Sequence, residues 1–331
     1  MDEPILKIHW ERFRAHVDLD VFMASRLLAP YIKDDIEQLS LLSEGCANTN
    51  YKVTFKGARL PVVIRIYMRD KTALQREVTI HSLVADKIPV AKHLYYDGNC
   101  LLYSYPYSIM EWIDGRLLRE VILSKNEKAI SQCAFEAGLY LNELRQIKFT
   151  HGGFFQEDLQ VRPFDKEEEY LPFVLNLLKD KVVKNDLDSS LHAAVSKLVN
   201  TYSKLLPNEE EANLTHADYD PANMMVTEMN GKWKIAAILD WEFAFAGTYL
   251  LDIGMMLRYS HKLPNYYENN FIAGIKSQGF NLPAEWKKQA KLMDLLCLLQ
   301  LVHYNPFSER PKMNRDVVSL IADTIRIWDS L

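Results

Sequence analysis

The pattern of apolar residues changes once along this chain, near residue 113. Before that point, short alternating runs such as 51–55 and 61–67 predict β-strands, and a turn at residues 56–58 joins these two into a hairpin. After it, apolar residues recur at helical spacing over long segments. A β-rich first third followed by a helix-rich remainder is typical of an α+β protein with two lobes. We therefore expect a smaller lobe over residues 1–113, with a helical extension at its start, and a larger lobe over residues 114–331.

Four further elements are expected from local patterns. The stripe of apolar residues between 72 and 85 predicts a helix, and residues 101–103 and 108–110 predict strands. The longest apolar run, 295–302, predicts a buried helix, because it is far shorter than the about 18 residues that a membrane span requires.

Composition excludes several classes of protein. Lys and Arg number 39 against 44 Asp and Glu, which gives a net charge of −5, whereas a general nucleic-acid binder carries a basic excess. The four cysteines form no C-x-x-C pair, and the N-terminal residues do not resemble a signal peptide. We expect a cytoplasmic protein, a monomer or a dimer, with no nucleic-acid or membrane partner.

Glycine is scarce, with 12 residues in the chain. Neither G-x-G-x-x-G nor G-x-x-x-x-G-K occurs. This excludes the dinucleotide-binding fingerprint and the P-loop, in which the backbone must approach phosphate closely.

The segment 214–242 interrupts the helical pattern and carries the candidate site. Asn230-Gly231 lies between two apolar runs, and this dipeptide strongly predicts a two-residue hairpin turn. The turn begins seven residues after Asn223 and ends nine before Asp240. Folding of the hairpin therefore brings these two side chains together at its open end, with Asp218 just upstream.

Two carboxylates and a carboxamide form an oxygen-rich site of the kind that suits Mg²⁺. The spacing H-x-D-x-x-x-x-N, formed by His216, Asp218 and Asn223, matches the protein-kinase catalytic loop except for the arginine after the histidine. In that loop the aspartate accepts the proton of the attacking hydroxyl and the asparagine holds metal. A second aspartate further along the chain holds metal that bridges the nucleotide phosphates.

With residues 238–242, Ala246-Gly247 and 252–254, this loop resembles the aminoglycoside phosphotransferase and choline kinase-like family of small-molecule kinases. The resemblance extends over residues 35–330. It implies a protein-kinase-like fold, ATP or GTP as the phosphoryl donor, Mg²⁺, and a small hydroxyl-bearing acceptor. By position it implies that Asp218 is the catalytic base and that Asn223 and Asp240 are metal ligands. It further implies that Asp252 braces the catalytic loop.

The first lobe continues the resemblance. Residues 42–51 resemble the loop that covers the nucleotide, 62–65 the strand that carries a phosphate-contacting cation, and 110–115 the hinge between lobes. Two features depart from the usual pattern: the covering loop has a single glycine, and the cation is an arginine where many relatives have lysine. The resemblance implies the following nucleotide-binding residues: Ser43, Gly45, Asn48, Arg65, Glu77, Glu111 and Ile113.

Some residues have two interpretations. Arg65 and Glu77 either form an ion pair, which we prefer, or both extend to solvent. His216 is interpreted as structural, and Asp220, which precedes a proline, as a turn residue. The acidic run 165–169 either attracts a cationic acceptor or is a solvated helix N-terminus, and we prefer the second interpretation.

Two alternatives to a small-molecule kinase were considered. A nucleotide-binding pseudokinase with a regulatory role predicts loss of a catalytic or metal-binding residue, whereas all three positions are filled. A metal-dependent hydrolase is disfavoured because the histidines form no H-x-H or H-E-x-x-H group. Antibiotic, choline-like amine, sugar and amino-alcohol acceptors remain open, as does the choice between ATP and GTP.

Overall fold

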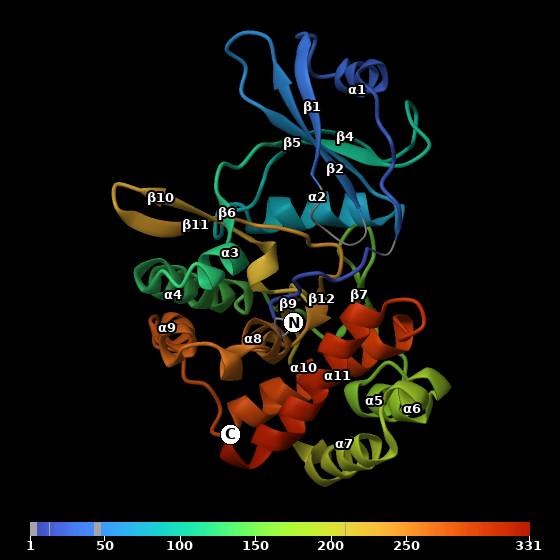
Figure 1. The fold of residues 1–331 in the computed structure, drawn as a ribbon, viewed down its shortest axis with the longest axis vertical. Helices are drawn as coiled ribbons and strands as arrows, with labels where there is room; N and C mark the ends of the chain where they lie inside the picture. The colour runs from blue at the N-terminus through green and yellow to red at the C-terminus, as the bar shows by residue number, and fades with distance from the viewer. Residues whose placement is uncertain (1–4, 13, 43–47, 209) are drawn as a thin grey trace.

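The structure is a computed structural model that describes residues 5–12, 14–42, 48–208 and 210–331. A β-sheet region, drawn at the top of Figure 1, is followed by a mainly helical region below it. This arrangement confirms the α+β class that the change of pattern near residue 113 predicted. In the part of the chain that is described, none of the helices combines the length and apolar composition needed to cross a bilayer.

The first region is built on a five-stranded antiparallel sheet with the strand order β1-β2-β3-β5-β4. Strand β2 alternates between buried and partly buried residues, as its sequence predicted. Helix α1 packs on one face of the sheet, where Leu27 joins Val53 and Ile64 in a hydrophobic core. The elements are α1 (Val21–Leu28), β1 (Ile36–Leu42), β2 (Thr49–Phe55), β3 (Val62–Ile66), α2 (Ala73–Val84), β4 (His93–Asp97) and β5 (Tyr107–Glu111).

The strand predicted at residues 101–103 is wrong. The carboxylate of Asp97 accepts hydrogen bonds from the backbone N–H groups of Asn99, Leu101 and Leu102, at 3.1, 2.8 and 3.1 Å. These bonds close a loop after β4 and occupy donors that a sheet would need. Leu101 is consequently 79% exposed, although its apolar side chain suggested a strand.

The second region surrounds helix α10 (Trp286–Tyr304), which is buried on nearly all sides between residues 290 and 299. A helix that is buried on nearly all sides belongs in a core, and the buried helix predicted at 295–302 is confirmed. The other helices are α3 (Leu118–Leu123), α4 (Glu127–Leu144), α5 (Tyr170–Lys179), α6 (Lys181–Asp186), α7 (Ser189–Tyr202), α8 (Tyr249–Met256), α9 (Asn265–Lys276) and α11 (Pro311–Ile327).

Two small sheets lie between the large sheet and these helices (Figure 1). One has the order β11-β10-β6 and the other β8-β7-β12-β9. Their strands are β6 (Arg116–Leu117), β7 (Gly153–Phe155), β8 (Val161–Pro163), β9 (Asn213–Thr215), β10 (Met224–Met229), β11 (Lys232–Ile238) and β12 (Phe245–Gly247). They carry the loops that form the candidate site.

Helices α4 and α9 meet at a reciprocal pair of glycines. A Cβ atom on Gly138 would lie 2.0 Å from the carbonyl oxygen of Phe271, and one on Gly274 would lie 2.0 Å from that of Phe135. Both obstacles are backbone atoms, which cannot rotate away. The two helices therefore approach as closely as they do only because neither residue has a side chain.

We expect Gly138→Ala to lower the free energy of unfolding by about 1–3 kcal/mol or more, because the helices must separate to admit the methyl group. Urea denaturation of the two proteins measures this difference. Gly98→Ala is the matched control, since a Cβ atom at Gly98 meets nothing within 4 Å. Equal loss of stability in both variants would contradict the role given to this contact.

Candidate active site

The loop after β9 is held by the buried carboxylate of Asp252, at the start of α8. Its two oxygens accept hydrogen bonds from the backbone N–H groups of His216, at 2.8 Å, and Ala217, at 2.9 Å. Burial raises the pKa of Asp252 to about 7, while these two donors act in the opposite direction. Ala217 has a φ of 62°, a conformation that is uncommon for a residue with a side chain. Asp252 thus fixes the strained turn that precedes Asp218.

The His216 ring connects the loop to the neighbouring hairpin. Its Nδ1 atom accepts the backbone N–H of Asp218 at 3.2 Å, so the proton resides on Nε2, which donates to the carbonyl of Leu239 at 3.0 Å. Burial lowers the pKa of His216 to about 4, which keeps the ring neutral. These contacts agree with the structural interpretation of this histidine.

The hairpin β10–β11 has the geometry that Asn-Gly predicted. Asn230 and Gly231 have φ angles of 52° and 73°, as a type I′ turn requires. At the open end, Met224 pairs with Ile238, and the N–H of Leu239 donates to the carbonyl of Asn223 at 2.8 Å. Asn223 and Asp240 are therefore brought together as the sequence predicted.

Asp218 and Asn223 contact each other directly. The Asn223 amide nitrogen donates to Oδ2 of Asp218 at 2.7 Å and to the Asp218 backbone carbonyl at 3.0 Å. Because the nitrogen is committed to Asp218, the amide oxygen is the atom of Asn223 that is left for a cation.

Arg65 links the sheet to this site. Its guanidinium donates to Oδ1 of Asp240 at 2.6 Å, and its Nε atom lies 3.7 Å from Oε2 of Glu77 on α2. The expected ion pair with Glu77 is thus present. Burial opposes the charge of Arg65, but Glu77 and Asp240 outweigh it and hold the pKa of the guanidinium above its usual value. That Arg65 also contacts Asp240 was not predicted.

The other residues that were proposed to bind the nucleotide lie in several different environments. Asn48 is buried, with its amide donating to Glu242 at 3.2 Å and accepting the N–H of Met68 at 3.2 Å. Glu111 accepts the N–H of Lys92 at 2.9 Å, and both Glu111 and Ile113 line a large cleft. Ser43 and Gly45 lie outside the described residues.

The cleft has a volume of about 1180 Å³, which is large enough for a nucleotide and a small acceptor together. Its walls include Arg65, Asp218, Asn223 and Asp240. Carboxylates at the base of such a cleft, with one cation, can orient a hydroxyl and hold a phosphate-bound metal ion. Burial and the nearby Asp240 carboxylate raise the pKa of Glu242 to about 7.

A second group of potential metal ligands includes Glu77, the ion-pair partner of Arg65. Ligand atoms of Glu77, His81 and His93 all lie within 4.8 Å of one another. The guanidinium of Arg65 faces the same carboxylate and repels a metal ion. Burial lowers the pKa of His81 to about 3 and that of His93 to about 4, so both rings are neutral.

These neutral histidines predict sensitivity to acid. The unfolded chain takes up a proton near the ordinary pKa of 6.5, whereas folded His93 does so only near pH 4. The stability contributed by the neutral His93 ring is therefore fully present above about pH 6.5 and is lost as the pH falls toward 4. We expect His93→Leu to be more stable relative to wild type at pH 5 than at pH 7, by about 2 kcal/mol. Urea denaturation at both pH values measures this difference, and a pH-independent difference would contradict the assignment.

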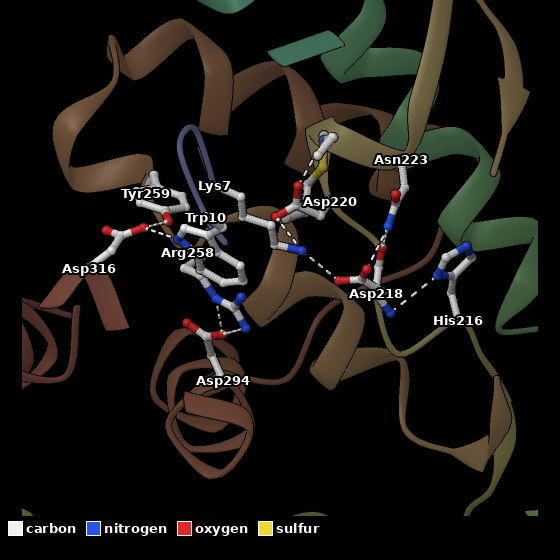
Figure 2. A network of polar contacts seen from close by, with 12 residues as sticks. Lys7, Trp10, His216, Asp218, Asp220, Asn223, Arg258, Tyr259, Asp294 and Asp316 are labelled. Carbon is white, nitrogen blue, oxygen red and sulfur yellow. Dashed lines mark hydrogen bonds and ion pairs between the residues drawn. The ribbon is translucent and has the colours of Figure 1, made fainter. Parts of the chain in front are cut away.

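Sequence reasoning missed the residues that approach Asp218 from the N-terminal segment. Figure 2 shows Lys7 between Asp218 and Asp220, and Trp10 next to Asp316. Asp220 also accepts the N–H of Ala222 at 2.8 Å, which agrees with its interpretation as a turn residue. Residues 5–12 contain no motif, so only the folded chain reveals this contact.

The arrangement of the two lobes, the braced loop and the hairpin is shared with proteins of known structure. Solved structures share this fold, among them aminoglycoside 2′-phosphotransferase-IIIa in its GDP complex. It has a TM-score of 0.69 and 13% identity, covering 93% of this chain and 99% of the other. A second is a thermostable mutant of APH(4)-Ia in a ternary complex with AMP-PNP and hygromycin B. Its TM-score is 0.63, with 17% identity over 90% of this chain and 97% of the other.

The chain belongs to the phosphotransferase enzyme family, whose model matches residues 38–286. The predicted family and fold are thereby confirmed. No curated protein matches the sequence significantly.

Proposed function

We propose that the protein transfers the γ-phosphoryl group of ATP or GTP to a hydroxyl group of a small molecule. The observation that carries this proposal is that one cleft is lined by Asp218 with its partner Asn223 and by Asp240 with its partner Arg65. The 1–113 region would bind the nucleotide, and the 114–331 region would bind the acceptor.

In this proposal Asp218 orients the acceptor hydroxyl and takes its proton as the bond to phosphorus forms. Its neighbour Asn223 keeps the carboxylate in place through the 2.7 Å hydrogen bond. When the nucleotide binds, Arg65 leaves Asp240 and contacts the phosphates instead. The covering loop and hinge, with Ser43, Gly45, Asn48, Glu111 and Ile113, would enclose the nucleotide, although the side chain of Asn48 is bound to Glu242 and Met68 here.

The residues present fit a magnesium ion. The donor set is the Asp240 carboxylate and the Asn223 amide oxygen, both hard oxygen ligands. Asp240 already binds a positive charge, since the Arg65 guanidinium lies 2.6 Å from its Oδ1 atom. When bound there, Mg²⁺ supplies neutralisation of charge on the phosphate oxygens.

The test is a phosphoryl-transfer screen with Mg-ATP and Mg-GTP. One solved structure with this fold holds GDP and kanamycin, and another holds hygromycin B. Kanamycin and hygromycin B therefore begin the panel of acceptors. Choline, ethanolamine, homoserine, macrolides and simple sugars complete it. Transfer to a compound supports the proposal. Tight nucleotide binding with no transfer to any compound or to water would contradict it and favour the pseudokinase alternative.

A further inference from the structure

Several residues of the N-terminal segment, residues 5–12, line the cleft, and Figure 2 shows one of them, Lys7, in contact with Asp218. Leu6 is 1% exposed and joins the large hydrophobic core. The next residue, Lys7, places its Nζ atom 2.6 Å from Oδ1 of Asp218 and 3.5 Å from Oδ2 of Asp220. The ammonium group therefore lies on the carboxylate that is proposed to take a proton from the acceptor.

The pocket around this ammonium is built for a cation. Asp220 is 1% exposed. Its Oδ2 atom has no hydrogen-bond partner among the described residues, and its counter-charge is the Lys7 ammonium, 3.5 Å away. Burial opposes the charge of Lys7, but Asp218 and Asp220 outweigh it and raise the pKa of the amine. Arg258, which also lies close, is neutralised by Asp294 at 2.7 Å. Two carboxylates thus remain to pair with one ammonium group.

Side chains fasten the segment to both lobes. Trp10 donates to Oδ2 of Asp316 at 2.8 Å, and Glu11 accepts the N–H groups of Lys312 and Met313, at 2.9 and 3.0 Å, at the start of α11. Arg12 donates to the carbonyl of Asn48 at 3.0 Å, in the other lobe. The segment spans the cleft as a strap held at both sides.

The backbone of the strap is suited to release. Leu6, Lys7 and His9 have φ angles of 55°, 58° and 70°, which are uncommon for residues with side chains and are maintained only by surrounding contacts. Residues 5–12 belong to none of the sheets formed by the described residues. The strap can therefore leave without breaking a strand pairing.

We propose that residues 5–12 are an internal ligand of the acceptor site, and that an acceptor must displace Lys7 before Asp218 can act. The proposal rests on the function proposed above, because it takes Asp218 as the catalytic base. Oδ2 of Asp218 already accepts the Asn223 amide, and Oδ1 accepts the Lys7 ammonium. A carboxylate oxygen can accept a second hydrogen bond, but the charge of Lys7 lowers the pKa of Asp218 against the effect of burial and so weakens it as a base. Occupancy by Lys7 thus reduces the fraction of protein that is competent to bind an acceptor.

The test uses Lys7→Ala in the full chain, with Lys56→Ala as the matched control because Lys56 is 70% exposed and does not line the cleft. The first measurement is hydrolysis of Mg-ATP, in which water takes the phosphoryl group and needs no identified acceptor. We expect Lys7→Ala to hydrolyse ATP about tenfold faster than wild type, since a charge-assisted hydrogen bond no longer blocks Asp218. n-Butylammonium, which replaces the missing side chain, should inhibit Lys7→Ala and leave wild type unaffected.

The second measurement is amide hydrogen exchange over residues 5–12, which requires no turnover. We expect exchange to be about tenfold faster in Lys7→Ala and unchanged in Lys56→Ala. If exchange is faster but hydrolysis is unchanged or slower, the proposal that Lys7 blocks Asp218 is overturned. Slower hydrolysis would also assign Lys7 a role in stabilising the transferred phosphoryl group. Unchanged exchange would show that Lys7 does not hold the strap. Absence of hydrolysis and transfer in wild type and Lys7→Ala alike would instead refute the proposed function.

Discussion

Asp218→Asn is expected to reduce phosphoryl transfer by about 10²–10⁴-fold, because the amide cannot take the proton of the attacking hydroxyl. The substitution preserves the shape of the side chain. It also leaves Asp252, which holds the loop backbone through hydrogen bonds to His216 and Ala217, untouched. The loss should therefore appear in kcat, with nucleotide affinity close to that of wild type. Steady-state kinetics and nucleotide titration together measure both quantities.

Asp35→Asn provides the control for this variant, because Asp35 is 81% exposed and does not line the cleft. Turnover in Asp218→Asn equal to that of the control would remove Asp218 from the mechanism. A parallel loss of nucleotide binding would point to a damaged loop, and denaturation by urea would reveal it.

The second large effect is expected for Asp240→Asn. The substitution removes a charged ligand from the proposed metal site and one of the two carboxylates that face Arg65. We expect the concentration of Mg²⁺ needed for half-maximal activity to rise by about 10–100-fold, which corresponds to the loss of one interaction with a charged group. A magnesium titration at fixed nucleotide measures it.

Asp35→Asn again serves as the control, since it makes the same chemical change outside the cleft. An unaltered magnesium requirement in Asp240→Asn would show that the ion is held elsewhere. A fall in kcat at saturating magnesium would add a role for Asp240 beyond metal binding.

Much of the site was predictable because its signals are local. Asn230-Gly231 requires a turn with two positive φ angles, and the hairpin brings Asn223 opposite Leu239, the neighbour of Asp240. The spacing from His216 to Asn223 likewise predicted the geometry of the loop that contains these residues. The ion pair between Arg65 and Glu77 was preferred because a charge in an apolar strand needs a partner.

The features that could not be predicted depend on long-range contacts. The Arg65–Asp240 hydrogen bond joins residues 175 positions apart, and no pattern in either segment requires it. The strand expected at 101–103 failed because Asp97 captures the neighbouring N–H groups, a competition that alternation of apolar residues does not reveal. Lys7 is an ordinary lysine in a segment without a motif.

The strap has a consequence for the order of events during synthesis. Residues 5–12 are translated before every strand and helix of the two lobes, yet Lys7 meets a partner 211 positions later and Trp10 one that is 306 positions later. Contacts of such high sequence separation form late, after the intervening chain has folded. A segment that is made before both lobes is thus the last to dock on them. Until α11 is complete, the nascent cleft has no strap across it.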